Sequence, residues 1–397
     1  MAERVGFEPT ISSSRTSRSV LYYYKNGSQI LSFLFSITSF NMKKILLIFS
    51  TSILLFLLTD FIITNYLEIR NFNKFHKSEK LIGHVLVPNF SGYFGSPLDN
   101  FYSKININDE GLRKSFLCKK IPINTLFVGD STTAGFEVED YSTFVSLINK
   151  NCSKYKINGV NAGVRAYDIH HVIANYERLS QAFQHKIVFY LVGLNIFVKK
   201  HYAKDPHHSN LIKRFGRAII IDEEKISFIE PSPDRTEKFY LNLRVFISDN
   251  FYFFTKLIKS KSSLLSFLVK NPKNEIKLVN KNKPEELSGF INSMKILNNK
   301  VRKNNAKLVV AVFPCLYTDC RQGSFERRRE FFENGFLQLK NHNIEVMQLV
   351  KIFNEKSKKG LLKKENMRFP KDGHLSEAGH DFMSKEIGNY LNQLISK

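Results

Sequence analysis

The chain has 397 residues, enough to bury one large hydrophobic core or two modest ones. Its formal net charge is +23, but the basic residues are spread from end to end, without the single basic stripe and interleaved aromatic residues that nucleic-acid binding requires. We therefore expect no nucleic-acid partner. Short basic runs such as Arg327-Arg328-Arg329 are interpreted as solvated helix faces, and attraction to anionic lipid or polysaccharide stays open.

A largely apolar stretch over residues 45–63 follows Met42-Lys43-Lys44. With Thr59-Asp60 included, it reaches the roughly 20 residues that span a membrane. No Ala-x-Ala-like cleavage site follows, which favours an uncleaved anchor over 42–67 rather than a cleaved signal peptide. Basic residues also follow the span, so positive charge alone does not set its orientation. The position near the start of the chain favours export, with the main domain on the periplasmic side of an inner membrane.

Residues 1–41 do not fit this organisation. The stretch over 3–10 resembles a peptide that arises when a tRNA gene is translated by mistake. A start at Met42 would place Lys43-Lys44 where a targeting segment begins. We interpret 1–41 as an extension foreign to the authentic protein.

Prolines and glycines over 68–120 predict a linker and an irregular lead-in segment. After it, β-rich and helical patterns alternate through a main domain over 121–397. This alternation predicts a flavodoxin-like three-layer α/β/α sandwich around a parallel sheet. Strands are predicted at 123–128, 157–160, 186–192, 307–313 and 344–347, and helices at 141–149, 168–181, 284–304, 325–340 and from 376 onward.

Residues 197–283 interrupt the alternation and are interpreted as an insertion or lid. They contain a predicted hairpin that pairs 218–221 with 226–229. An aromatic-rich helical region follows over 239–268, and we expect its aromatic side chains to pack in a core or lid rather than bind a ligand.

Polar turns follow three of the predicted strands: Gly129-Asp130-Ser131, Asn161–Tyr167 and Gly193-Leu194-Asn195. In an open α/β sheet such turns share the carboxyl edge, where ligands bind. A late polar segment, Asp372-Gly373-His374, precedes the last predicted helix. The sequence therefore predicts that these four segments meet in one crevice, with Ser131 in a solvent-facing turn.

The four blocks and their order resemble the SGNH (GDSL-type) hydrolases, over about 122–197 and 305–393, and Asn108–Arg113 resembles a lead-in motif of membrane-linked bacterial members. The resemblance implies a serine esterase in which Ser131 is the nucleophile and His374 its base. It implies that Asp372 orients His374. The oxyanion donors would be the backbone N–H groups of Ser131 and Ala166 and the side chain of Asn195. No metal and no organic cofactor is implied.

Three positions depart from the family pattern. Ala166 stands where a glycine is usual, and Ile196 replaces an acid after Asn195. Lys371 occupies the usual place of the triad acid, three residues before His374, whereas Asp372 lies two before it. Either Asp372 orients His374 from a shifted loop, or Ser131 and His374 act as a dyad. His380, within the last predicted helix, is the less favoured base.

An acyl ester, above all an O-acetyl ester on a small molecule or an envelope glycan, is the expected substrate. One alternative is an O-acyltransferase that moves the acyl group to a polysaccharide hydroxyl. A second is a non-catalytic glycan-binding or assembly protein on the same fold, suggested by Lys371 and Ile196. Ser131 as a mere helix cap and Asn195 as a mere turn residue are the corresponding structural interpretations.

The four cysteines lack the spacing of zinc ligands. In an exported chain their even number permits two disulfides. Cys118 precedes the first strand and Cys152 ends the helix that returns from it, so both lie at the amino edge of the sheet and are expected to bond. Cys315 and Cys320 share the loop after the fourth strand. The pairs His170-His171 and His207-His208 are interpreted as solvated residues rather than metal ligands.

Overall fold

The computed structural model describes residues 42–70, 72–95, 100–193, 217–221, 225–229, 235–259, 284–312, 335–369 and 373–396. The chain divides into two compact units, Met1–Ile62 and Ile63–Lys397. A helix over Met42–Tyr66 has 25 residues, and an 18-residue stretch of it has a mean hydropathy of 2.4, so its length and composition suffice to cross a membrane. A signal sequence near the start of a chain has the same properties.

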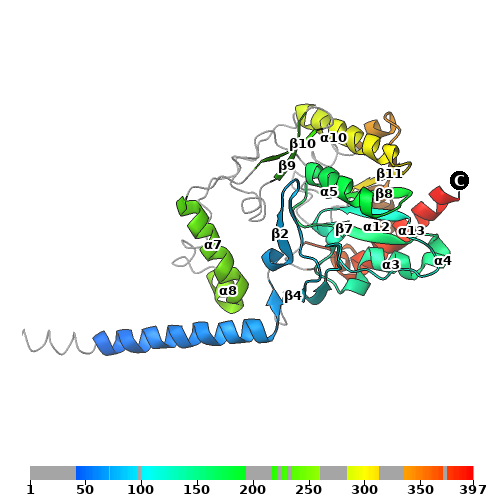
Figure 1. Cartoon of the computed structure of the whole chain (residues 1–397). Helices are drawn as coiled ribbons and strands as arrows, with labels where there is room; N and C mark the ends of the chain where they lie inside the picture. The colour runs from blue at the N-terminus through cyan, green and yellow to red at the C-terminus, as the bar shows by residue number, and fades with distance from the viewer. Residues whose placement is uncertain are drawn as a thin grey trace, which may run out of the picture. The chain divides into compact units, whose positions relative to one another are not determined.

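A five-stranded parallel sheet organises the second unit (Figure 1). Its spatial order is β12-β11-β8-β6-β7, and every neighbouring pair is parallel. Numbered along the chain, this is the order 2-1-3-4-5 of flavodoxin-like folds, which confirms the predicted fold class. The order reverses between β6 and β8, where such folds bind ligands. The strands are β6 (Thr125–Gly129), β7 (Gly159–Gly163), β8 (Ile187–Val192), β11 (Lys307–Val312) and β12 (Glu345–Met347).

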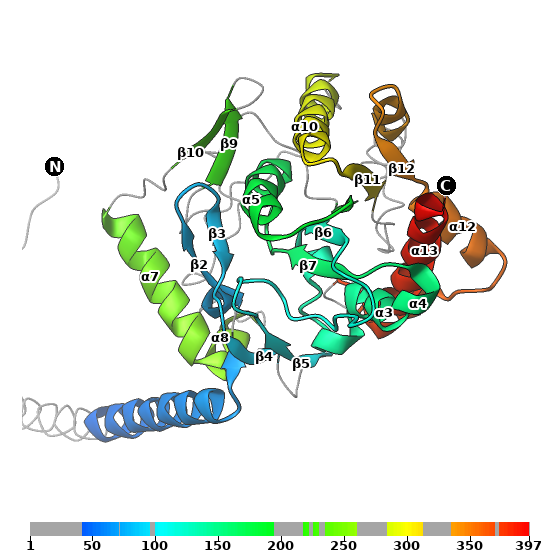
Figure 2. The ribbon, with the colours of Figure 1, turned by 45° about the vertical axis from the view of Figure 1, so that its right-hand side comes forward.

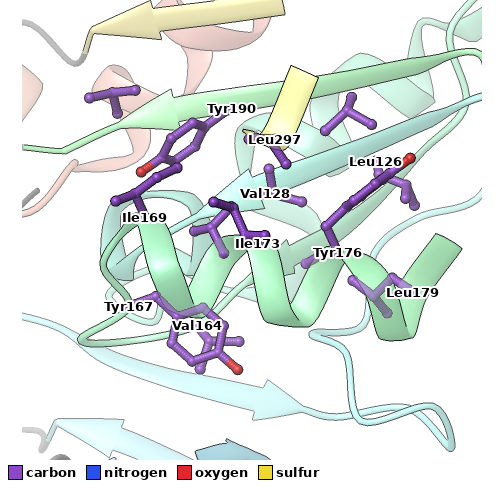
Figure 3. Packing of buried hydrophobic residues seen from close by; sticks show 14 of the residues in the cluster. Leu126, Val128, Val164, Tyr167, Ile169, Ile173, Tyr176, Leu179, Tyr190 and Leu297 are labelled. Carbon is purple, nitrogen blue, oxygen red and sulfur yellow. The ribbon is translucent and has the colours of Figure 1, made fainter. Parts of the chain in front are cut away.

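Successive strand residues point into two different hydrophobic cores, which is why the strands read as continuous apolar runs. Leu126 and Val128 of β6 face the core drawn in Figure 3, whereas Phe127 faces the opposite one. Helices cover both faces of the sheet and make three layers (Figure 2). The first core is covered by α5 (Ile169–Ala182) and α10 (Pro284–Lys303), and the second by α3 (Phe144–Lys150), α12 (Leu349–Lys358) and α13 (Glu377–Ile395).

The segment over 68–120 is more regular than the sequence predicts. Five short strands occupy it, in a β2–β3 hairpin and a β1-β4-β5 sheet. Each has at most five residues, Gly83, Gly92 and Gly95 lie within the strands, and Pro88 lies between two of them, so no alternating pattern is long enough to be recognised. Their buried side chains, such as Leu86 and Ile105, join the core beside α5. The strands are β1 (Ile69–Arg70), β2 (His76–Glu79), β3 (Gly83–Leu86), β4 (Ser91–Gly95) and β5 (Tyr102–Asn106).

The predicted hairpin is present within 197–283: β9 (Arg217–Ile221) pairs antiparallel with β10 (Lys225–Ile229). The aromatic region that follows forms two helices, α7 (Arg235–Asn250) and α8 (Tyr252–Lys259). Phe239 and Tyr240 are 62% and 63% exposed, so of the two expected environments, a core or a lid, the core is wrong for them, because an aromatic-rich pattern does not specify what covers it.

Shorter elements complete the description. The helix predicted over 325–340 is described as helical from 335 to 340. The helix predicted from 376 begins after the N-cap Ser376, whose hydroxyl accepts a hydrogen bond from the Gly379 N–H at 3.3 Å. The remaining short helices are η1 (Phe72–Phe75), η2 (Asp140–Ser142), α4 (Cys152–Tyr155) and η5 (Lys364–Met367).

Candidate active site

Ser131 opens a single helical turn, α2 (Ser131–Ala134), directly after β6. The cap of this turn is Asp130, whose carboxylate accepts the Thr132 N–H at 2.9 Å. Ser131 is therefore not the helix cap. Burial raises the pKa of Asp130, and its bond to Thr132 opposes that rise. Ser131 is only 9% exposed, so the expectation of a solvent-facing turn is wrong: neighbouring segments cover it.

The turns after β6 and β7 and Gly193, the residue directly after β8, meet at one edge of the sheet, whereas Leu194 and Asn195 lie outside the described residues. Gly129 pairs in register with Gly163 on one side and with Leu191 on the other. A Cβ at Gly163 would lie 2.3 Å from the Ala134 nitrogen, and a Cβ at Gly193 would lie 2.1 Å from Asp130 Oδ2. Only glycine allows the second and third turns to approach the nucleophile turn this closely.

His374 reaches this edge from a segment 243 residues later in the chain. Its Nε2 lies 2.9 Å from Ser131 Oγ, and its side chain keeps 19% exposure. The His374 carbonyl accepts the Phe369 N–H at 3.0 Å, and Leu375 forms a β-bridge with Arg368, which fixes the segment before α13. The structure thus brings together the two residues that the sequence predicts as nucleophile and base.

The other ring nitrogen of His374 faces a residue that the sequence analysis missed. His374 Nδ1 lies 3.3 Å from Glu137 Oε1, and Arg165 Nη1 lies 2.7 Å from the same oxygen. The Glu137 side chain is fully buried. No motif spacing marks Glu137; the only local signal is the acidic run Glu137-Val138-Glu139-Asp140 just after the nucleophile block.

The turn after β7 carries Arg165 and Ala166. Ala166 has φ +64°, in the left-handed region where the resemblance leads us to expect glycine. The lead-in segment holds this turn in place: His84 Nε2 lies 2.9 Å from the Arg165 carbonyl oxygen, and the Tyr167 hydroxyl donates to the His84 carbonyl at 2.7 Å. Burial lowers the pKa of His84 well below its ordinary value, and the nearby His76 and His171 add to this effect.

Arg113, the last residue of the predicted lead-in motif, holds the loop after the nucleophile. Its guanidinium donates to the carbonyl oxygens of Ala134 at 2.9 Å and Val138 at 2.6 Å, and also to that of Gly135. It lies 3.2 Å from Asp140 Oδ1, and both side chains are almost completely buried. The motif therefore supports the loop that presents Glu137.

Several predicted site residues lie outside the described residues, and their roles stay predictions: Asn195, Ile196, Lys371, Asp372, Cys315, Cys320, His207 and His208. His380 is buried in α13, and its Nδ1 accepts the Phe144 N–H at 3.2 Å. His170 and His171 are buried in α5 rather than solvated, because that face of the helix packs against other buried groups; His171 Nδ1 lies 2.8 Å from Asp168. Within the described ranges no group of three or more His, Cys, Asp and Glu side chains is placed to hold a metal ion.

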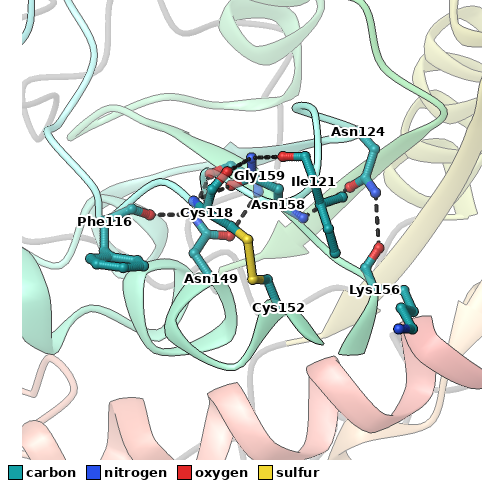
Figure 4. Close-up of a disulfide and its surroundings, with 9 residues drawn as sticks. All are labelled: Phe116, Cys118, Ile121, Asn124, Asn149, Cys152, Lys156, Asn158 and Gly159. Atoms are coloured by element: carbon teal, nitrogen blue, oxygen red, sulfur yellow. Dashed lines mark hydrogen bonds between the residues drawn. A yellow bond between two sulfur atoms is a disulfide. The ribbon is translucent and has the colours of Figure 1, made fainter. Parts of the chain in front are cut away.

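Cys118 and Cys152 are joined by a disulfide with a Cα–Cα distance of 6.3 Å (Figure 4). Asn158 links the same region: its side-chain amide donates to the Cys118 carbonyl and accepts the Cys118 N–H, both at 3.0 Å. Asn158 directly precedes β7, so the bond lies at the amino edge of the sheet, at the other end of the strands from Ser131.

Neither a family model nor a curated protein matches this sequence. Solved structures with a similar fold include a variant of an acetyl xylan esterase from Geobacillus stearothermophilus, with 13% identity and a TM-score of 0.38, covering 68% of this chain and 96% of that one. The psychrotrophic esterase EstA from a Pseudoalteromonas species has 12% identity and a TM-score of 0.38, covering 69% and 100%. TesA has 12% identity and a TM-score of 0.35, covering 68% and 99%. At such identities and TM-scores the likeness carries no argument about activity, which has to come from the site itself.

Proposed function

We propose that this protein is a serine esterase that cleaves acyl esters through an acyl-serine intermediate. The observation that carries the proposal is the 2.9 Å distance between His374 Nε2 and Ser131 Oγ. A serine hydroxyl is a weak nucleophile near neutral pH and needs a base within hydrogen-bond reach. A non-catalytic binding protein has no need of this pairing, which joins two distant chain segments at the ligand-binding edge of the sheet.

The chemistry follows from the pair. Ser131 Oγ attacks the ester carbonyl carbon while its proton passes to His374 Nε2, which leaves a negative charge on the carbonyl oxygen. The bond to the alcohol then breaks, and the alcohol leaves with the proton from His374. Water repeats the sequence on the acyl-serine: His374 takes a proton from the water and returns it to Ser131 Oγ, and the carboxylic acid is released.

The oxyanion needs donors that are in place before the reaction. We assign this role to the backbone N–H groups of Ser131 and Ala166 and to the side-chain amide of Asn195. Support comes from the register of β6 and β7, which starts the turns of Ser131 and Ala166 side by side. Asn195 follows Gly193, which contacts Asp130 of the nucleophile turn.

The substrate proposed is an O-acetylated or otherwise acylated glycan outside the cytoplasm. Support comes from the resemblance to SGNH hydrolases and from the apolar helix Met42–Tyr66, which would anchor the domain to a membrane. Acyl transfer to a polysaccharide hydroxyl would use the same residues with a sugar as acceptor in place of water. No feature of the described residues favours transfer over hydrolysis.

A fluorophosphonate probe tests the proposal directly, because only an activated serine reacts with it. The full chain in detergent should be labelled at one peptide, the one that contains Ser131, and Ser131→Ala should remain unlabelled. Absence of labelling at Ser131 in folded wild-type protein would overturn the proposal.

With p-nitrophenyl acetate as donor, adding an oligosaccharide acceptor then separates hydrolysis, which releases acetate, from transfer, which acetylates the sugar.

A further inference from the structure

We propose that Glu137 is the carboxylate that orients His374, and that Arg165 holds this carboxylate in place. The inference rests on the esterase function proposed above. The residue that positions His374 would then lie six residues after Ser131. It would not be Asp372, which lies two residues before His374.

The first support is the geometry around His374. One ring nitrogen lies 2.9 Å from Ser131 Oγ and the other 3.3 Å from Glu137 Oε1. A base in this position needs a hydrogen-bond acceptor at Nδ1, because that bond keeps Nε2 unprotonated and stabilises the imidazolium that forms during attack. Among the described residues, Glu137 supplies the carboxylate at that nitrogen.

The second support is the environment of the carboxylate. Glu137 is fully buried, whereas Arg165 and His374 each keep 19% exposure. A buried carboxylate requires a paired charge, and Arg165 Nη1 provides it at 2.7 Å from the same oxygen that faces His374. The arrangement leaves the base accessible to substrate while its acidic partner is shielded from water.

The third support is the rigidity of the loop that carries Glu137. The Ser103 hydroxyl donates to the Glu137 carbonyl at 2.8 Å, and Arg113 binds the carbonyl of Val138 at 2.6 Å. These bonds come from the lead-in segment, and Arg113 also binds the Ala134 carbonyl, so the backbone before and after Glu137 is fixed. An orienting group has to be held in this way, because small displacements weaken catalysis strongly.

Glu137→Gln is the decisive substitution. A glutamine amide can donate to Nδ1 and thereby favour the tautomer with a proton on Nε2, which cannot accept the Ser131 proton. We expect the fluorophosphonate labelling rate to fall by on the order of 10²–10⁴. The pH midpoint of labelling should also move to lower pH, because the imidazolium loses its neighbouring negative charge. A merely structural role would not move that midpoint.

Glu139→Gln is the matched control. Glu139 lies two residues further along the loop, is exposed, and accepts the Lys104 N–H at 2.9 Å through an oxygen that glutamine retains. The rate at which the probe labels Ser131 in Glu139→Gln should stay within about threefold of wild type. Glu137→Asp keeps the charge on a shorter side chain and should recover part of the rate lost in Glu137→Gln. Asp372→Asn should cost less than about tenfold.

The outcomes separate this inference from the proposed function. If wild-type Ser131 does not react with the probe, the esterase proposal fails. If wild type reacts and Glu137→Gln reacts equally fast with an unchanged midpoint, the assignment of Glu137 is overturned, and a large loss in Asp372→Asn would then place the acid there. Should Glu137→Gln not fold, Glu137→Asp decides: a folded variant with a loss of more than about tenfold supports the assignment, and an unchanged rate overturns it.

Discussion

Arg113 and Asp140 form an ion pair of 3.2 Å between side chains that are 0% and 4% exposed. The same guanidinium donates to backbone carbonyls on both sides of Glu137, so one lead-in residue holds the loop that follows the nucleophile. Replacing one member of such a buried group leaves acceptors and a charge without partners inside the protein, at a cost of about 3–5 kcal/mol.

Arg113→Lys should therefore destabilise the domain although it keeps the charge. A lysine ammonium cannot match the planar fork that reaches Asp140 and the carbonyls together. We expect the free energy of unfolding, measured by urea titration and circular dichroism, to fall by about 3 kcal/mol or more. Lys114→Ala, at the exposed neighbouring position, should change it by less than about 0.5 kcal/mol. An Arg113→Lys protein as stable as this control would contradict the role assigned to the guanidinium.

Ser131→Ala and His374→Ala should each lower kcat for p-nitrophenyl acetate by on the order of 10⁴–10⁶. Because the two side chains act as one unit, the double variant should be no slower than the single ones. The disulfide and the thermal unfolding midpoint serve as controls for folding. If the loss of kcat in the double variant equals the product of the two single losses, the residues act independently. That result would contradict the proposed proton transfer.

Ala166→Gly should stabilise the protein or leave it unchanged. A φ of +64° destabilises an alanine in the folded state by about 1–2 kcal/mol, and glycine avoids this strain. Glycine is also freer in the unfolded chain, which lowers the stability of the folded state by about 0.4–1 kcal/mol. We expect a net gain of about 0.5–1 kcal/mol in the free energy of unfolding, with esterase activity retained because the backbone N–H is unchanged. A loss of stability would show that the Ala166 methyl group makes contacts worth more than the strain.

The stability of the domain should fall in mild acid because histidines are buried in the neutral form. Burial is the main cause that lowers the pKa of His380 to about 3, and Arg113 adds to it. In the unfolded chain an ordinary histidine binds a proton near pH 6.5. The contribution of the neutral His380 side chain to the free energy of unfolding is therefore complete above pH 6.5. It is lost as the pH falls from 6.5 towards 3, by about 1.4 kcal/mol per pH unit.

His380→Asn removes this titration while offering an oxygen near the Nδ1 atom that accepts the Phe144 N–H. The variant should be less stable than wild type at pH 7.5, and the difference should shrink by about 2 kcal/mol at pH 5. Urea unfolding of both proteins at the two pH values measures this change. A difference that is equal at both pH values would mean that His380 is not held neutral by the fold.

The sequence was sufficient to predict the sheet and to predict that Ser131 and His374 lie close together, for physical reasons. A strand buried on both faces, such as Ile187–Val192, is continuously apolar, and such runs are recognisable without knowledge of their neighbours. Ser131 and His374 could be placed because each follows a distinct local pattern and parallel topology brings their turns to one edge.

Glu137 could not be found in this way, since its role depends on where two distant segments place Arg165 and His374. Its local sequence is that of any acidic loop. His170 and His171 were misinterpreted for a related reason: polar neighbours suggested solvent, whereas His171 packs beside His84 of the lead-in segment and His170 faces Ser293 of α10. Burial of a polar residue is decided by tertiary contacts, and short strands over 68–106 gave too little pattern to predict those contacts.

Ser131 leaves the ribosome long before His374. His374 follows Ser131 by 243 residues, and it is set in place by α13, where Gly388 contacts Tyr155 of α4 closely enough that a Cβ would lie 2.8 Å from the ring. Contacts between such distant segments form late in folding, because the intervening chain must first be ordered. A chain still being synthesised or translocated therefore carries Ser131 without His374, and under the proposed mechanism it cannot cleave esters in the compartment where it is made until the last helix has docked.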